Sequence, residues 1–546
     1  MFSRGRLWAL KTCTLALVLV AVAPAPRAHA DNDVMLQGFW WDSPQDWWNK
    51  LRRSAYDFAS SGFKRVWLPP MYKDANGGFG MGYGTFDGYD LGEFDQKGSV
   101  ATRFGTRAEL ERFTYRLNEL GVDPIGDMVL THRTGGDMDP NESSWTRFNH
   151  PHGRFSLTHT DFDHSPKEWK FGENLDYWKD YVRNELKEWG HWVTESIGLK
   201  GFRIDQAKEL HADYLREWLG HGAMYDKFSV AEYFDGNIDK LEDYAKRSGS
   251  KVFDFALFFT LREMANDRSG FFDMRKLVGA GLIGRNSNLA VTFAENHDTD
   301  RSQPISFDKM MAYSYILFSE GTPTVFLKDY WEYGLKDAID PLIAIRRTLI
   351  GGSTTVLHAD NNVVVLQRNG WDGRPGAVLV LNNHGQDGRS AWVSVKPEWA
   401  GKDLIDYTGN QAGKKVELDG RVELSAGPRG YAIYSIEVPG FDPKKADFAP
   451  YPRPEGRRDR EARLERERLA REAAKANGAS TADANGAGLP LDLDKVASDP
   501  SQIRNAVTAG AATNGRVDRP ISRTPGMLGG VDRTMNDRIR DRIADG

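Results

Sequence analysis

The sequence contains a single cysteine, Cys13, among its 546 residues. Cys13 lies in an N-terminal apolar run that we expect to be removed, so the mature chain would have no disulfide and no cysteine-ligated metal. An excess of basic residues is also lacking, because 72 Lys and Arg face 77 Asp and Glu and give a formal net charge of −5. This balance argues against nucleic acid as a partner.

A membrane-spanning run is lacking as well. The N-terminal apolar run, residues 13–23, is shorter than the roughly 20 residues that a spanning helix needs. Basic residues precede it, and the small residues around His29 offer a cleavage site before Asp31. This pattern predicts a secretory signal peptide at residues 1–30 rather than an uncleaved anchor. We therefore expect a secreted protein, extracellular or periplasmic, with no membrane association after the signal is removed.

Short apolar runs alternate with longer amphipathic stretches between residues 31 and 350. The runs predicted as strands are residues 34–40, 65–68, 122–130, 201–204, 228–231, 252–255, 289–294 and 324–327. The clearest predicted helices are residues 44–59, 107–120, 175–195, 207–219 and 307–318. This α/β alternation predicts a parallel sheet closed into a (β/α)8 TIM barrel. No Gly-rich dinucleotide fingerprint follows the first strand, so nothing favours a doubly wound open sheet.

Three further segments differ from the barrel pattern. Residues 133–174 follow the third strand without a helix, and a connection of this length predicts a functional insertion. Residues 351–439 contain short apolar runs separated by Gly, Asn and Asp, and predict an antiparallel β domain. Its predicted strands are residues 363–367, 377–381, 392–395, 416–418 and 431–436. Residues 440–546 are charged and poor in aromatic residues, and predict a mostly disordered tail.

Polar residues follow four of the predicted barrel strands, and the active sites of TIM barrels lie at these strand ends. In chain order they are His132, Asp205, Glu232, and His297 with Asp298. Three carboxylates therefore converge on one pocket. Glycoside cleavage needs one carboxylic acid to protonate the leaving oxygen and one carboxylate to attack the sugar or to activate a water.

Arg203 lies two residues before Asp205, so both side chains face the same side of the predicted strand. A guanidinium in this place would favour the ionised form of Asp205 that a nucleophile needs. His132 and His297 are placed to donate hydrogen bonds to sugar hydroxyls. Either histidine taken alone would more often be structural.

These four motifs, in this order, resemble the signature regions of the α-amylase family, glycoside hydrolase family thirteen. Other segments are similar to the bacterial liquefying-type α-amylases, namely LPPMYK at 68–73, GYG at 82–84, YDLGEF at 89–94, QKG at 96–98, RFGT at 103–106 and GTP at 321–323. The resemblance covers residues 34–438. It implies the same barrel, with a short domain B inserted after the third strand and an antiparallel domain C behind it.

The resemblance also implies a role for each matching residue. Asp205 would be the nucleophile, Glu232 the general acid and then base, and Asp298 a stabiliser of the distorted sugar. The other implied substrate contacts are Tyr83 as a stacking platform, Arg203, His132 and His297 on the same sugar, and Lys208 on the leaving-group side.

The implied chemistry requires no cofactor, but the family carries a structural calcium. Its Asn ligand is replaced here by Thr131, and a second ligand position falls on neutral Asn174, with Asp176 nearby. Calcium affinity depends on the number of charged oxygen ligands. We therefore expect the calcium site to be weakened or absent, with retention through substituted ligands as the alternative. Glu295 is a further departure, because the family usually has Asp there.

The expected function is that of a secreted α-amylase that hydrolyses internal α-1,4-glucosidic bonds of starch with retention of configuration. We expect it to act as a monomer on starch and maltooligosaccharides and to release maltooligosaccharides. A 4-α-glucanotransferase or related transglycosylase is the alternative, because its chemistry is identical up to the glycosyl-enzyme. The intact carboxylate set argues against a non-catalytic glucan-binding protein.

Overall fold

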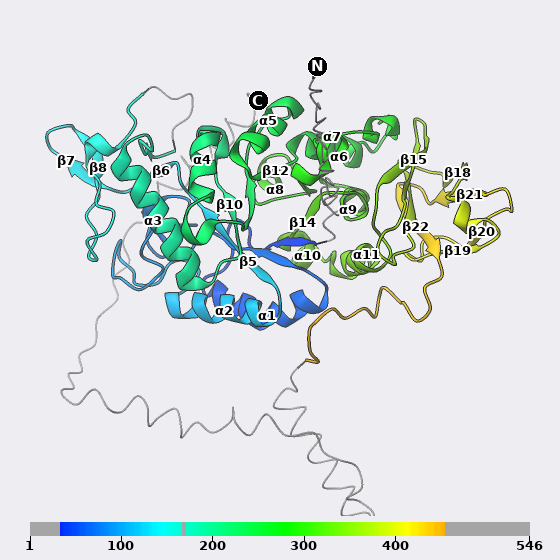
Figure 1. Ribbon diagram of the computed structural model, residues 1–546, viewed down its shortest axis with the longest axis horizontal. Coiled ribbons are helices and arrows are strands. Elements are labelled where there is room, and N and C mark those ends of the chain that lie inside the picture. Colours follow the sequence, from blue (N-terminus) through cyan, green and yellow to red (C-terminus); the bar gives the residue numbers. More distant parts are fainter. Residues whose placement is uncertain (1–32, 166–170, 454–546) are drawn as a thin grey trace, which may run out of the picture. The chain divides into compact units, whose positions relative to one another are not determined.

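The computed structural model describes residues 33–165 and 171–453, so the predicted signal peptide and residues 454–546 of the predicted tail lie outside the described residues. Eight parallel strands close into a barrel in the order β1-β14-β13-β12-β11-β10-β5-β2 (Figure 1), which confirms the predicted TIM barrel. These strands are β1 (Met35–Gln37), β2 (Arg65–Trp67), β5 (Asp123–Met128), β10 (Gly201–Ile204), β11 (Phe228–Ala231), β12 (Lys251–Phe253), β13 (Ala290–Phe293) and β14 (Thr322–Phe326).

Helices cover the barrel. The longer ones are α1 (Trp47–Ser60), α2 (Arg107–Glu119), α3 (Asp180–Ile197), α4 (Ala212–Leu219), α5 (Ile238–Ser248), α6 (Phe255–Asn266), α9 (Lys309–Phe318) and α11 (Lys336–Thr348), and the shorter ones are α7 (Ile283–Asn286), α8 (Thr299–Ser302) and α10 (Leu327–Trp331). In α2 the buried residues Leu110, Phe113 and Leu117 repeat every three or four positions, as one helix face requires. Among the described residues, no helix has both the length and the apolar character needed to cross a membrane.

Two predicted helices begin five residues later than expected. The helix predicted at 175–195 begins at Asp180, because the chain before it stays extended and Leu175 N–H donates to the Thr131 carbonyl. The helix predicted at 207–219 begins at Ala212, since a short 3-10 turn follows the left-handed residue Gln206. Both errors fall where the chain leaves the carboxyl edge of the barrel, and local periodicity does not reveal such tertiary contacts.

The predicted insertion contains two small antiparallel pairs. β6 (His132–Arg133) pairs with β9 (Glu173–Asn174), and β7 (Asp137–Asp139) pairs with β8 (Ser144–Arg147). The first pair joins the two ends of the insertion beside the barrel. A third small pair, β3 (Lys73–Asp74) with β4 (Thr85–Asp87), lies in the connection that follows β2.

An antiparallel β domain follows the barrel, as predicted. Its main sheet has the order β15-β16-β17-β22-β19-β20, a separate pair is β18-β21, and α9 of the barrel packs against β17 and β22 (Figure 1). The strands are β15 (Thr354–Ala359), β16 (Val363–Arg368), β17 (Ala377–Asn382), β18 (Arg389–Ser394), β19 (Asp403–Asp406), β20 (Lys414–Lys415), β21 (Arg421–Ala426) and β22 (Gly430–Ile436).

The prediction of a strand at residues 416–418 is wrong. Strands β20 and β21 lie on either side of it, and the Gly420 N–H closes a turn onto the Glu417 carbonyl. Gly420 has a φ of 86°, a conformation that favours glycine.

The first residues of the predicted tail pack on the barrel. Phe448 N–H donates to the Ser60 carbonyl over 2.9 Å, and the Arg347 guanidinium lies 4.5 Å from the centre of the Phe448 ring. The packed chain therefore extends about ten residues past the predicted boundary at residue 440.

Candidate active site

A single buried guanidinium organises the carboxyl edge of the barrel. Arg203 lies on β10, and its Nη1 donates to Asp205 Oδ1 over 2.7 Å and to Asp127 Oδ1 over 2.9 Å. Its Nη2 lies 2.9 Å from Glu232 Oε2. The strands β5, β10 and β11 are neighbours in the barrel, so they bring these three carboxyl groups around one cation.

The two predicted catalytic carboxyls each leave one oxygen available. Asp205 Oδ2 is buried and has no hydrogen-bond partner among the described residues, whereas Oδ1 is held by Arg203. Glu232 Oε2 contacts Arg203 and also accepts a hydrogen bond from the Gln206 amide over 3.1 Å. Both donors reach Oε2, and neither contacts Oε1. The geometry therefore fits the predicted pair of a nucleophile and an adjacent acid.

Burial and the neighbouring charges together shift the pKa of Asp205. Burial raises the pKa of Asp205 well above its usual range, Arg203 opposes that rise, and the Glu232 and Asp127 carboxylates add to it. The expectation that Arg203 keeps Asp205 ionised thus identifies only one of the opposing contributions. Three carboxyls thus surround one guanidinium. A retaining mechanism needs a proton on the acid residue before the first displacement.

His297 and Tyr83 form the next layer of the site. Their rings are almost parallel, with centroids 5.4 Å apart, and His297 Nε2 lies 3.0 Å from the Tyr83 hydroxyl. That hydroxyl donates to Asp127 Oδ2 over 2.8 Å, and the Gln37 amide lies 2.8 Å from His297 Nδ1. Burial, with a contribution from Arg203, lowers the pKa of His297 to about 3, so this histidine is neutral at physiological pH.

The other predicted sugar contacts lie around the same edge. Both ring nitrogens of His132 contact protein groups, with Nδ1 at 2.8 Å from the Thr131 hydroxyl and Nε2 at 2.9 Å from the Tyr83 carbonyl. Lys208 is partly exposed, and its Nζ lies 3.7 Å from Asp235 Oδ2. The contacts of His132, Lys208 and His297 with the sugar remain predictions.

Three functional side chains were not singled out from the sequence. Trp41, in the loop after β1, donates its indole N–H to Asp298 Oδ1 over 3.0 Å. Trp67, the last residue of β2, donates to Asp127 Oδ2 over 3.0 Å. Asp127 is fully buried and receives hydrogen bonds from Trp67, Tyr83 and Arg203. In the sequence, the feature that could have pointed to these three side chains is their position at or shortly after the end of a barrel strand.

The candidate calcium ligands lie near the two ends of the insertion. The Thr131 hydroxyl contacts His132, and Asp176 Oδ1 accepts a hydrogen bond from the Trp178 amide. Asn174 offers no charge, and calcium takes six to eight oxygen ligands, several of them usually carboxylates. The expectation of a weakened calcium site therefore stays a prediction. Elsewhere in the described residues, one group has the composition of a metal site, Asp87 with two histidines of the insertion.

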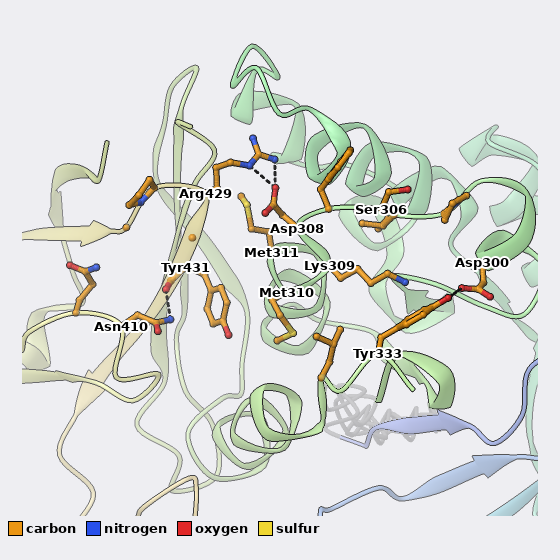
Figure 2. Close-up of a pocket in the computed structure, with 18 residues that line it drawn as sticks. Asp300, Ser306, Asp308, Lys309, Met310, Met311, Tyr333, Asn410, Arg429 and Tyr431 are labelled. Atoms are coloured by element: carbon orange, nitrogen blue, oxygen red, sulfur yellow. Dashed lines mark hydrogen bonds and ion pairs between the residues drawn. The ribbon is translucent and has the colours of Figure 1, made fainter. Parts of the chain in front are cut away.

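A cavity of about 870 Å³ lies away from these carboxyls, between the start of α9 and the β domain (Figure 2). Figure 2 shows Tyr333 bonded to Asp300 on its barrel side and the Arg429–Asp308 ion pair between the two domains. Neither Asp205 nor Glu232 lines this cavity. The arrangement of the carboxyls therefore identifies the candidate active site, and the size of a cavity does not.

Comparisons with known proteins identify relatives of this chain. The family model described as Alpha-amylase C-terminal matches residues 377–435. A glucan 1,4-alpha-maltohexaosidase of Bacillus sp. (strain 707) is 30% identical over 481 residues, covering 74% of this chain and 92% of the relative. An alpha-amylase of Geobacillus stearothermophilus is 31% identical over 490 residues, covering 75% of this chain and 88% of the relative.

The solved structure of the Geobacillus thermoleovorans alpha-amylase, complexed with acarbose, has the same fold. It matches with a TM-score of 0.56 and 16% identity, covering 76% of this chain and 100% of that chain. The matches to the two bacterial relatives cover about three quarters of this chain. The chain therefore belongs to the α-amylase family of retaining glycoside hydrolases, which act on starch-type glucans.

Proposed function

We propose that the protein is a secreted α-amylase that hydrolyses internal α-1,4-glucosidic bonds of starch and releases maltooligosaccharides. One observation carries the catalytic part of the proposal. Arg203 holds one oxygen of Asp205 and one oxygen of Glu232, while Asp205 Oδ2 has no hydrogen-bond partner among the described residues. The family relationship supports the substrate class.

The reaction proceeds in two displacements. Asp205 Oδ2 attacks the anomeric carbon while the Glu232 proton moves to the glycosidic oxygen, so the bond to the leaving sugar breaks and a glycosyl ester forms. Glu232 then takes a proton from water, and the water oxygen attacks the anomeric carbon and frees Asp205. Asp298, held by the Trp41 indole, lies beside His297 where the distorted sugar would bind. Two inversions leave the product in the α configuration.

The test is incubation of the purified protein with soluble starch, with the products resolved over time by chromatography and NMR. We expect maltooligosaccharides of intermediate length early in the reaction and the α-anomer in fresh product. The β-anomer in fresh product would contradict the double displacement. Glucan chains that lengthen when an acceptor sugar is added, with little increase in reducing ends, would identify a glucanotransferase instead.

Variants test the named residues. Asp205→Asn and Glu232→Gln should each lower starch hydrolysis by several orders of magnitude in folded protein. Asp213→Asn, on the exposed surface of α4, is the matched control and should retain activity. Near-wild-type hydrolysis by either active-site variant would refute its assignment. Secretion is tested separately by sequencing the N-terminus of protein recovered outside the cells, which should begin at Asp31.

A further inference from the structure

The insertion approaches the connection after β2 through two histidines and one buried aspartate. Asp87 is the last residue of β4, and His150 and His152 follow β8 in the insertion. Asp87 Oδ2 lies 2.8 Å from His152 Nε2 and 3.4 Å from His150 Nδ1. The ligand atoms of all three residues lie within 4.8 Å of one another.

One of these atoms is buried without a partner. The His150 side chain is only 4% exposed, and its Nδ1 makes no hydrogen bond among the described residues although it points at the Asp87 carboxylate. A buried polar atom left in this way is costly, because it has lost water and gained no partner. A cation between the imidazole and the carboxylate would satisfy both groups.

We propose that Asp87, His150 and His152 bind a divalent transition-metal ion of the zinc type, which clamps the insertion to the connection after β2. Two imidazole nitrogens and one carboxylate oxygen are ligands that suit zinc, whereas calcium prefers an all-oxygen set. Zinc–ligand bonds of about 2.0–2.1 Å place tetrahedral ligands about 3.3 Å apart. The separation of Asp87 Oδ2 from His150 Nδ1, 3.4 Å, matches that spacing, and the separation from His152 Nε2, 2.8 Å, would lengthen when the ion enters.

His152 must change its tautomer to bind the ion. Its Nδ1 accepts a hydrogen bond from the Arg154 amide over 3.1 Å, so the proton resides on Nε2, which faces Asp87. Metal binding at Nε2 moves this proton to Nδ1 and replaces the Arg154 contact with water. The lost hydrogen bond is exposed, so the metal needs to offset only a small cost.

The ion would act on structure and not on the glycosidic bond. Asp87 lies four residues after Tyr83, the predicted platform for the sugar, and the histidines belong to the insertion beside the active-site edge. A clamp here would fix both segments relative to the barrel.

The experiment uses the full chain after treatment with a chelator and dialysis. Zinc is titrated by calorimetry, bound metal is counted by elemental analysis, and the melting temperature is measured with zinc or with calcium. We expect one zinc per chain and a rise in Tm of about 3 °C when free zinc is 100 times Kd. Absence of zinc binding at micromolar concentrations, or an equal rise with calcium, would overturn the proposal.

Matched variants locate the ion. His150→Gln should weaken zinc binding more than about 100-fold, because even loss of a residue that orients a ligand costs roughly 10–100-fold. His159→Gln is the control, since His159 lies in the same insertion and its ring stacks on His164 at 3.9 Å. Unchanged binding in the His150 variant, or loss in the His159 variant, would place the zinc elsewhere and overturn the assignment.

X-ray absorption spectroscopy on the zinc-loaded wild type identifies the ligands of the ion without relying on the folding of any variant. It should show two imidazole nitrogens and a carboxylate oxygen around the ion. A shell made only of oxygen would contradict the proposed ligands.

Discussion

Glu295 is predicted to make stability depend on pH in the direction opposite to that of an ordinary carboxylate. It is fully buried after β13, and its Oε2 accepts hydrogen bonds from Lys309 over 2.9 Å and from the Ile305 amide over 3.0 Å. Lys309 is shared with Asp329, at 2.5 Å. Burial raises the pKa of Glu295 to about 7, Lys309 opposes this rise and Asp329 adds to it. One ammonium thus serves two buried carboxyls, and one of them keeps its proton.

The sign follows from proton binding in the two states. The folded pKa of about 7 exceeds the unfolded value of 4.5, so between these pH values the native protein holds a proton that the unfolded chain has lost. The stabilisation from protonated Glu295 is full below pH 4.5 and is lost as pH rises through 7. At about 1.4 kcal/mol per pKa unit, the difference amounts to about 3 kcal/mol.

Glu295→Gln removes this titration with little change in shape. The amide oxygen can face Lys309 and Ile305, and the amide nitrogen can donate to the Thr299 hydroxyl, which now donates to Glu295 Oε1 over 2.7 Å. Denaturant unfolding of both proteins from pH 4.5 to pH 8 gives the comparison. The variant should gain about 3 kcal/mol relative to wild type across this range. A difference that stays constant within about 0.5 kcal/mol would show that Glu295 does not titrate there and would refute the reasoning.

Three further predictions address the domain interface, the tail and the active site. Arg429→Met should lower the free energy of unfolding by about 3 kcal/mol, because Asp308 would lose its ion-pair partner at the interface in Figure 2. A urea unfolding curve identical to that of the wild type would contradict this. Truncation after residue 453 should leave Tm unchanged, whereas truncation after residue 440 should lower it by removing Phe448; equal melting of the two would show that Phe448 contributes nothing. Tyr83→Phe should lower kcat/KM on starch about tenfold to 100-fold in folded protein, since Asp127 loses a hydrogen bond; wild-type kinetics would exclude that role.

The barrel and the catalytic carboxyls could be predicted because each depends on a local pattern. Most barrel strands fall in short apolar runs, Asp205 and Glu232 follow directly after such runs, and Asp298 follows a few residues after another. Strand order in a barrel then brings these ends together without further information. The short strands of the β domain were less predictable, because the turn that ends at Gly420 depends on a backbone conformation and not on hydrophobic period.

Contacts between distant segments could not be predicted in the same way. The hydrogen bonds from Trp41 to Asp298 and from Tyr83 to Asp127 connect loops whose separation in the sequence carries no periodic signal. The contact between Asp87 and His150 could not be predicted for the same reason, because it joins two irregular connections. The pKa of Asp205 also required the structure, since the cost of burial exceeds the effect of the neighbouring Arg203 that the sequence revealed.

Covalent trapping tests the central assignment most directly. The protein is incubated with an activated fluorinated maltosyl donor whose glycosyl-enzyme breaks down slowly, and the adduct is located by mass spectrometry of peptides. Glu232→Gln, with the same donor, should retain the adduct longer because the base for its hydrolysis is missing. The structure predicts one glycosyl group on Asp205, whose Oδ2 has no hydrogen-bond partner among the described residues. An adduct on Asp298, on Glu232 or on no residue would contradict the account.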